Sequence, residues 1–181
     1  PTMQDFPDRP HCCCFTGHRP EKLEIGPDLV IRRLDEAITA AIGRGYTTFI
    51  SGAAKGVDLW AAELVLERRL SRPEIRLVCA VPYQGFGLHW KDGYSELFAR
   101  VIQAADAVRY VCDSYSRSAY QCRNEWMVDR SSLLIAAYTG VSGGTRNTIE
   151  YARKQDACEI QYLELAAEGQ AEEGRLRRPQ G

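Results

Sequence analysis

Short apolar runs alternate along the chain with segments that carry apolar residues every three or four positions. The apolar runs, which predict strands, are residues 12–15, 47–50, 76–81, 107–112, 133–138 and 159–163. The segments with helical spacing are residues 27–42, 57–70, 94–105, 121–130 and 145–155. This order of strand and helix predicts an α/β fold with a doubly wound, mostly parallel sheet in three layers.

The alternation extends from about residue 10 to residue 165, so we expect one domain over 10–165. Residues 166–181 are small, charged and poor in apolar side chains, which is typical of a mobile tail. Two polar segments with aromatic residues, 83–93 and 113–120, predict long loops.

Charge and composition narrow the set of partners. The formal net charge is −1 and 45% of the residues are hydrophobic, which is ordinary for a globular protein. Nonspecific binding to nucleic acid needs clustered basic residues, so we do not expect nucleic acid as a partner. No apolar run approaches ~18 residues, which predicts no membrane span and a cytoplasmic protein.

Glycine-bearing turns follow three of the predicted strands, at residues 16–19, 51–58 and 142–145. The carboxyl ends of parallel strands meet at one edge of a sheet, where ligands of such folds bind. A strand–glycine–helix junction brings backbone N–H groups close to an anion, and the helix N-terminus favours negative charge. Three such turns predict a site for a phosphorylated ligand, most simply a nucleotide.

The first turn contains Thr16 and Gly17, but it lacks the glycine pattern of dinucleotide-binding folds and of P-loops. Arg19 follows it and has a guanidinium suited to a phosphate or carboxylate, although a surface arginine beside a turn would look the same.

The second turn has more specific chemistry. Ser51 and Gly52 allow a tight bend, Gly56 precedes a helix, and Lys55 brings a positive charge to its N-terminus. Asp58 is suited either to capping that helix or to holding a ribose hydroxyl.

The third turn and the two aromatic loops complete the set of candidate residues. Gly143 and Gly144 free backbone donors, and Thr145 is suited to capping the next helix or binding a phosphate. The loop aromatics are candidates for stacking on a base, for a hydrophobic lid or for an oligomer contact: Tyr83, Phe86, Trp90, Tyr115 and Tyr120. His18 and His89 lack partners for a catalytic triad, which leaves a nucleophilic hydrolase unsupported.

The chain has seven cysteines, three of them consecutive at Cys12, Cys13 and Cys14. Adjacent side chains of a strand point to opposite faces, so these three do not share a metal ion. Without any Cys-x-x-Cys pair, we expect no metal site and interpret the cysteines as small buried hydrophobic residues in a reducing compartment.

Taken together, several motifs resemble the YpsA-like family. They are CFTGHRP at residues 14–20, the segment 51–63 with KGVDLWAAE, Pro82-Tyr83 with Trp90, RNEWMVD at 123–129, and Gly143-Gly144-Thr145 with Tyr151-Ala152. The resemblance spans about residues 12–155. The family belongs to the SLOG superfamily of Rossmann-like domains, which also includes the LOG proteins and the DNA-processing protein DprA.

The resemblance implies a nucleotide or a derivative such as ADP-ribose or an NAD-like molecule, with no further cofactor. In this first hypothesis the chain is a binding protein or a sensor. Arg19 and Lys55 would neutralise phosphates, Asp58 or Asn124 would meet ribose hydroxyls, and Tyr83 and Trp90 would stack on the base.

Two other hypotheses stay open, as does a homodimer. LOG enzymes cleave an N-glycosidic bond with an Arg and a Glu, and Arg123 and Glu150 lie at similar offsets here, although Arg146 and Asn147 replace a Gly-Thr pair. Glu150 would stabilise the sugar or activate water while Arg123 holds the phosphate. The last hypothesis is a nucleic-acid-handling module of the DprA kind.

Overall fold

The fold is known from a computed structural model, which describes residues 9–166. The predicted tail, 166–181, lies outside the described residues apart from Ala166.

Six strands form a single parallel sheet, as the alternation of apolar runs predicted. The strands are β1 (Cys12–Gly17), β2 (Thr48–Ser51), β3 (Arg76–Val81), β4 (Ala107–Tyr110), β5 (Leu133–Ala137) and β6 (Glu159–Tyr162). Their order in the sheet is β4-β3-β2-β1-β5-β6, and every neighbouring pair is parallel. The α/β, doubly wound prediction is confirmed.

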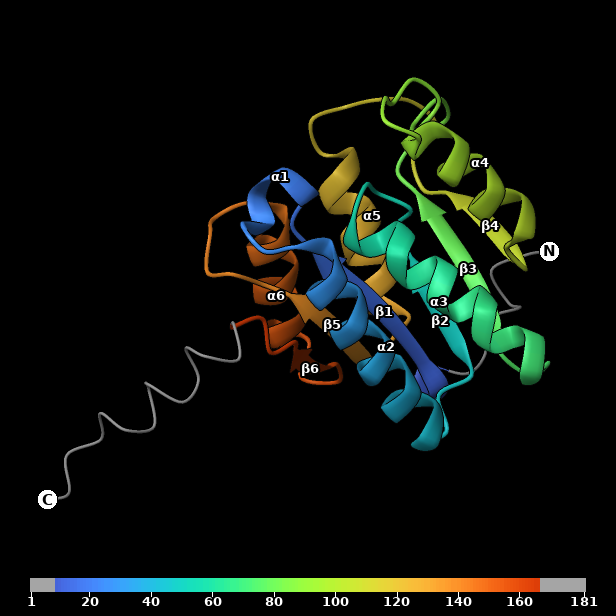
Figure 1. Ribbon diagram of the computed structural model, residues 1–181. Helices are drawn as coiled ribbons and strands as arrows, with labels where there is room; N and C mark the ends of the chain where they lie inside the picture. Colours follow the sequence, from blue (N-terminus) through green and yellow to red (C-terminus); the bar gives the residue numbers. More distant parts are fainter. Residues whose placement is uncertain (1–8, 167–181) are drawn as a thin grey trace, which may run out of the picture.

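Helices cover both faces of the sheet, which gives the three predicted layers (Figure 1). The long helices are α2 (Pro27–Gly43), α3 (Val57–Ser71), α4 (Tyr94–Ala104), α5 (Ala119–Asp129) and α6 (Gly144–Lys154). Helices α2, α3 and α4 pack on one face, and α5 and α6 on the other. Two short elements were not predicted, the 3₁₀ turn η2 (Arg9–His11) and the one-turn helix α1 (Pro20–Leu23). Within residues 9–166, no helix has the length and apolar character needed to cross a membrane.

The two faces of the sheet build two hydrophobic cores, and the consecutive cysteines divide between them. Cys13 joins the core under α2, α3 and α4, whereas Cys12 and Cys14 join the core under α5 and α6. The prediction of buried cysteines is confirmed for these three, for Cys79 and for Cys158. It is wrong for two: Cys112, in the loop after β4, is half-buried, and Cys122, in α5, is exposed.

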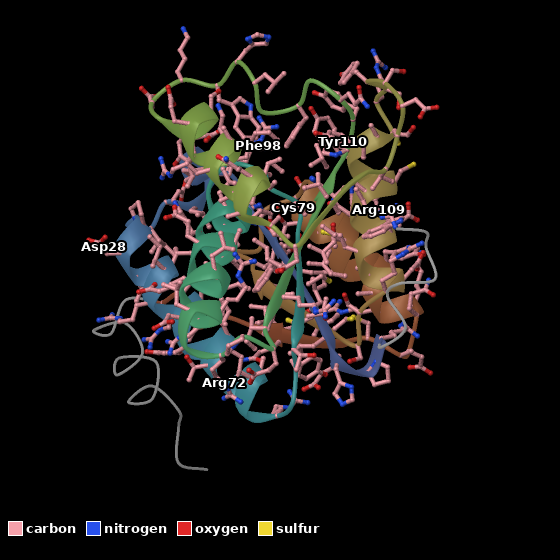
Figure 2. All side chains as sticks on the ribbon, turned by 90° about the vertical axis from the view of Figure 1, so that its right-hand side faces the viewer. Asp28, Arg72, Cys79, Phe98, Arg109 and Tyr110 are labelled. Carbon is pink, nitrogen blue, oxygen red and sulfur yellow. The ribbon has the colours of Figure 1, made fainter. Side chains whose placement is uncertain are left out.

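The winding of the chain reverses between β1 and β5. From β1 the chain adds β2, β3 and β4 on one side, and it then crosses back to place β5 on the other side of β1. Ligands of such sheets bind outside the carboxyl ends of the strands at the point of reversal. In Figure 2 the edge of the sheet where the strands have their carboxyl ends lies on the side of Tyr110, the last residue of β4. Arg72 lies at the opposite end of the molecule.

Candidate functional site

A cavity of about 340 Å³ opens at the carboxyl end of β1 and lies between the glycine turns. This volume is within the range of small-molecule sites. Its walls come from the end of β1, helix α1, the β2–α3 turn, the start of α5 and the start of α6. The lining residues are Phe15, Thr16, Gly17, His18, Arg19, Lys22, Ala54, Lys55, Asp58, Phe86, Tyr120, Arg123, Asn124, Gly143, Gly144 and Thr145.

Most of the residues singled out from the sequence meet in this one cavity. Those that line it are Thr16, Gly17, Arg19, Lys55, Asp58, Arg123, Asn124, Gly143, Gly144 and Thr145. They come from three separate glycine turns and from α5, so the sheet edge assembles them as a parallel α/β fold predicts. Their roles toward a ligand stay predictions.

Three residues of the second turn lie behind the cavity and shape it. The hydroxyl of Ser51 donates to the carbonyl of Asp58 at 2.7 Å and accepts from the Ala53 amide at 3.2 Å. Gly56 has a φ of 83° and precedes α3, a backbone conformation that glycine adopts without strain. A Cβ at Gly52 would lie 2.6 Å from Asp58 Oδ2 and 2.8 Å from Arg123 Nη1, so only glycine lets those side chains come so close.

The two aromatic residues chosen for base stacking also lie behind the wall. Tyr83 shares a hydroxyl hydrogen bond of 3.2 Å with Tyr120, and Trp90 packs edge-on against Phe86 with ring centroids 4.8 Å apart. Lys55 Nζ lies 5.5 Å from the centre of the Trp90 ring, a cation–π contact that helps to hold the amine. The Phe and Tyr residues that line the cavity are Phe15, Phe86 and Tyr120.

Glu150 and Arg123, the two residues predicted to be catalytic, line different cavities. The carboxylate of Glu150 pairs with Arg146 at 3.1 Å, and both side chains are about half exposed. Glu150 and Arg146 line a cavity of about 330 Å³, with Tyr138 and Arg153. The α6 residues Thr145, Thr148, Ile149 and Ala152 face inward, so positions 146 and 150 lie on the outer side of the helix. The predicted catalytic pair therefore has no shared site in this structure.

At the base of the cavity, two buried charges oppose each other. Asp58 is 7% exposed and Arg123 is 4% exposed. Burial raises the pKa of Asp58 to about 6, while the nearby Arg123 charge and the Ala54 amide act in the other direction. Asp58 accepts that amide at 3.4 Å and does not cap α3, whose N-cap residue Gly56 has no side-chain cap.

Hydrogen bonds to fixed acceptors hold the guanidinium of Arg123. Nη1 donates to the carbonyls of Gly52 and Ala80, and Nε donates to Asn124 Oδ1 at 2.8 Å. One side chain of α5 thereby ties the end of β2 to β3. These three hydrogen bonds fix the position of the Arg123 guanidinium in the cavity floor.

The wall of the cavity includes the N-terminus of α6 and the turn that precedes α3. The N-cap residues of α3 and α6 are Gly56 and Gly143, and neither helix end has a side-chain cap. Thr145 thus does not cap α6. The first N–H groups of a helix have no partner within the helix, so the N-terminus of α6 in the cavity wall offers donors and positive potential to an anion. In α3, the Leu59 amide already donates to the carbonyl of Ala54.

Cationic side chains line the same cavity. Arg19, Lys22, Lys55 and Arg123 line the cavity against a single carboxylate, Asp58. The cavity is therefore electropositive, although the chain as a whole has a net charge of −1.

His18 belongs to this wall too, and its Nε2 is buried without a hydrogen-bond partner. Its ring lies 5.6 Å from that of Tyr138. Burial, followed by the charge of Lys22, lowers the pKa of His18.

Six lining residues were not among the site residues chosen from the sequence: Phe15, His18, Lys22, Ala54, Phe86 and Tyr120. Lys22 had a usable signal, since it lies one helical turn beyond Arg19, but the helix α1 that places it was not predicted. Phe86 and Tyr120 were recognised as loop aromatics, and nothing in their local sequence separates them from Tyr83 and Trp90. Within residues 9–166, no group of three or more His, Cys, Asp or Glu side chains is placed to hold a metal ion.

A parallel six-stranded sheet with helices on both faces and a cavity at its point of reversal defines a Rossmann-like α/β domain. The chain belongs to the YspA SLOG family, whose YpsA model matches residues 13–166. It is 27% identical over 157 residues to UPF0398 proteins of Bacillus thuringiensis strain Al Hakam and Bacillus cereus strain Q1, covering 80% of this chain and 83% of each relative.

Two solved structures share the fold. DNA processing protein A from Helicobacter pylori, described with its single-stranded DNA binding mode, has a TM-score of 0.60 and 16% identity, over 94% of this chain and 76% of that one. DNA processing protein A (DprA) from Streptococcus pneumoniae has a TM-score of 0.54 and 15% identity, over 91% of this chain and 56% of that one. Similarity at this level of identity concerns the fold alone.

Proposed function

We propose that this protein binds a nucleotide or a nucleotide derivative of the ADP-ribose or NAD type in the cavity at the end of β1. The observation that supports this most is the meeting of the uncapped α6 N-terminus with four cationic side chains in one cavity. Such an arrangement suits a diphosphate, because backbone donors and diffuse positive charge serve its oxygens together.

The remaining surfaces suit the rest of a nucleotide. Tyr120, a half-buried aromatic residue of the wall, can stack on a base, and Asn124 and Asp58 offer acceptors for ribose hydroxyls. This differs from the stacking pair expected from the sequence, since Tyr83 and Trp90 support the wall from behind.

Ligand binding is expected to raise the melting temperature of the protein. A ligand at a hundredfold excess over its Kd stabilises the folded state by ~2.7 kcal/mol. For a domain of this size, that corresponds to an increase of roughly 5–10 °C. The measurement is a thermal-shift titration with AMP, ADP, NAD and ADP-ribose.

Lys55→Ala is expected to reduce that shift by about half, which corresponds to a roughly tenfold weaker affinity. Lys154→Ala is the matched control, because Lys154 is exposed at the end of α6 and does not line the cavity. A shift of equal size in both variants would place the ligand elsewhere. The absence of any shift with the wild type at millimolar ligand would overturn the proposal.

Binding of ADP-ribose is expected to tighten as the pH falls from 7.5 to 5.5. The pKa of Asp58 in the folded protein is about 6, so over this range its carboxylate takes up a proton and stops repelling the pyrophosphate. The gain should be several-fold, up to about tenfold, per charge removed. Isothermal titration at the two pH values measures it.

Asp58→Asn is the control for this pH dependence. That variant should bind equally well at both pH values, apart from the contribution of His18, which gains charge in the same direction. A pH dependence that is unchanged in Asp58→Asn would assign it to His18 instead.

Single-stranded DNA is the second candidate ligand, favoured by the described DNA-binding mode of the Helicobacter pylori relative in fold. The likeness in fold argues for nucleic acid as a partner. The net charge of −1 argues against it, as expected from the sequence. A salt-sensitive mobility shift of single-stranded DNA, competed away by ADP-ribose, would favour DNA in the same cavity.

A further inference from the structure

A second cavity, of about 330 Å³, lies on the outer side of α6 and shares no lining residue with the cavity at the end of β1. It is bounded by α6 and by the segment that follows β5, next to the edge strand β6 (Figure 1). Its lining residues are Tyr138, Gly140, Arg146, Ile149, Glu150 and Arg153. Ile149 is the one aliphatic side chain among them, so this cavity suits a polar ligand better than an apolar one.

The charged side chains of this cavity all come from one face of α6. Arg146, Glu150 and Arg153 occupy positions i, i+4 and i+7 of the helix, which places them in one row. Arg146 and Glu150 pair at 3.1 Å, so their charges offset each other. Within residues 9–166, Arg153 has no carboxylate partner, and its charge makes the cavity positive.

A hydrogen bond to the edge strand orients Arg153. Its Nη2 donates to the hydroxyl of Tyr162, the last residue of β6, at 2.8 Å. This partner is neutral, and a guanidinium has several more N–H donors, so the charge and most of the donors of Arg153 are available to a ligand. The guanidinium is therefore held beside the cavity without being neutralised.

The segment after β5 adds to the polar wall. Tyr138 is half-buried, and within residues 9–166 its hydroxyl has no hydrogen-bond partner. A Cβ at Gly140 would meet nothing within 4 Å, so the backbone is open at this point. Guanidinium, hydroxyl and accessible backbone amide groups are the donors that phosphate oxygens accept from in proteins.

We propose that this second cavity is a binding site for a phosphate-class anion, with Arg153 as its main binding residue and Arg146 as the second. A phosphate accepts two parallel hydrogen bonds from the fork of a guanidinium. Its charge also competes with Glu150 for Arg146, and an exposed ion pair of this kind is exchanged at little cost in stability. The site is independent of the nucleotide proposed for the first cavity.

The two cavities are neighbours, so an experiment has to distinguish them residue by residue. The ring of Tyr138, in the wall of the second cavity, lies 5.6 Å from the ring of His18, in the wall of the first. The first cavity is also electropositive and can attract the same anion. Gly140 reports on the second cavity, whereas Gly17 and Gly144 report on the first.

An NMR titration of the isotope-labelled full chain with sodium phosphate, at constant ionic strength, makes this distinction. The backbone amide of Gly140 and the Nε–H of Arg153 should shift and reach saturation. Arg153→Gln should weaken the binding seen at Gly140 by about tenfold or more, the order expected for the loss of a charge-assisted hydrogen bond. Lys55→Ala, which changes only the first cavity, should leave the Gly140 titration as it is.

Lys154→Gln is the matched control, because Lys154 is exposed, follows Arg153 at the end of α6 and does not line the cavity. It removes the same charge and should leave the affinity nearly unchanged. The proposal is wrong if the Gly140 shift grows without saturation, if both variants lose the same affinity, or if phosphate shifts only Gly17 and Gly144. Saturation at Gly140 in a protein that binds no nucleotide would support this site while the proposed function fails.

Discussion

Replacing Arg123 with methionine should lower the free energy of unfolding by about 3–5 kcal/mol, the typical cost of removing one partner from a buried charge pair. The substitution leaves the Asp58 carboxylate buried without its opposing charge, and it leaves the carbonyls of Gly52 and Ala80 without their donor. Methionine keeps much of the apolar stem of the arginine, so packing is a smaller part of the loss. Urea unfolding followed by circular dichroism measures the change.

Two further measurements separate the charge from the packing. In Arg123→Met the carboxyl of Asp58 is free to protonate, so the loss of stability should be smaller at pH 5 than at pH 7.5. Adding Asp58→Asn to Arg123→Met should restore part of the stability, because no uncompensated charge then remains. If the double variant is as unstable as the single one at both pH values, the pair does not hold the cavity floor by its charges.

Gly52→Ala should destabilise the protein by about 1–3 kcal/mol and weaken ligand binding along with it. The added methyl would lie 2.6 Å from Asp58 Oδ2 and 2.9 Å from Arg123 Cζ, so these side chains have to move apart. Because both line the cavity, the same movement changes the site. Chemical denaturation and the ADP-ribose thermal shift measure the two effects on one sample.

Gly43→Ala is the matched control for this substitution. Gly43 is the last residue of α2, and a Cβ there meets nothing within 4 Å. The change should be neutral or stabilising by up to about 1 kcal/mol, because glycine is the poorer helix former. Equal losses in both variants would show that the space at Gly52 is not tight.

The features of the fold that could be predicted are those that residues close together in the sequence determine. Gly45 and Pro27 marked the ends of α2 to within two residues, because glycine and proline act through their own backbone. The short helix α1 was missed, since four residues carry no readable period. The strand order was also not readable, because the pairing of β1 with β5 joins Cys13 to Leu133.

The same distinction holds for the site. The three glycine turns were recognisable because each one follows a strand, and the parallel sheet then brings them together. The contact of Asp58 with Arg123 could not be recognised from the sequence, because the two residues come from different helices and no local pattern links them. Glu150 was misplaced by an offset taken from the LOG pattern, whereas the inward face of α6 is set by Thr148, Ile149 and Ala152.

The central place of β1 has a consequence for how the protein is made. Of the strands in residues 9–166, β1 is synthesised first, and its neighbour β5 follows only at Leu133. Until then β1 is an open edge with buried-type side chains, Cys12 to Phe15, and such an edge invites pairing with another chain. A fragment that ends before β5 is therefore expected to aggregate.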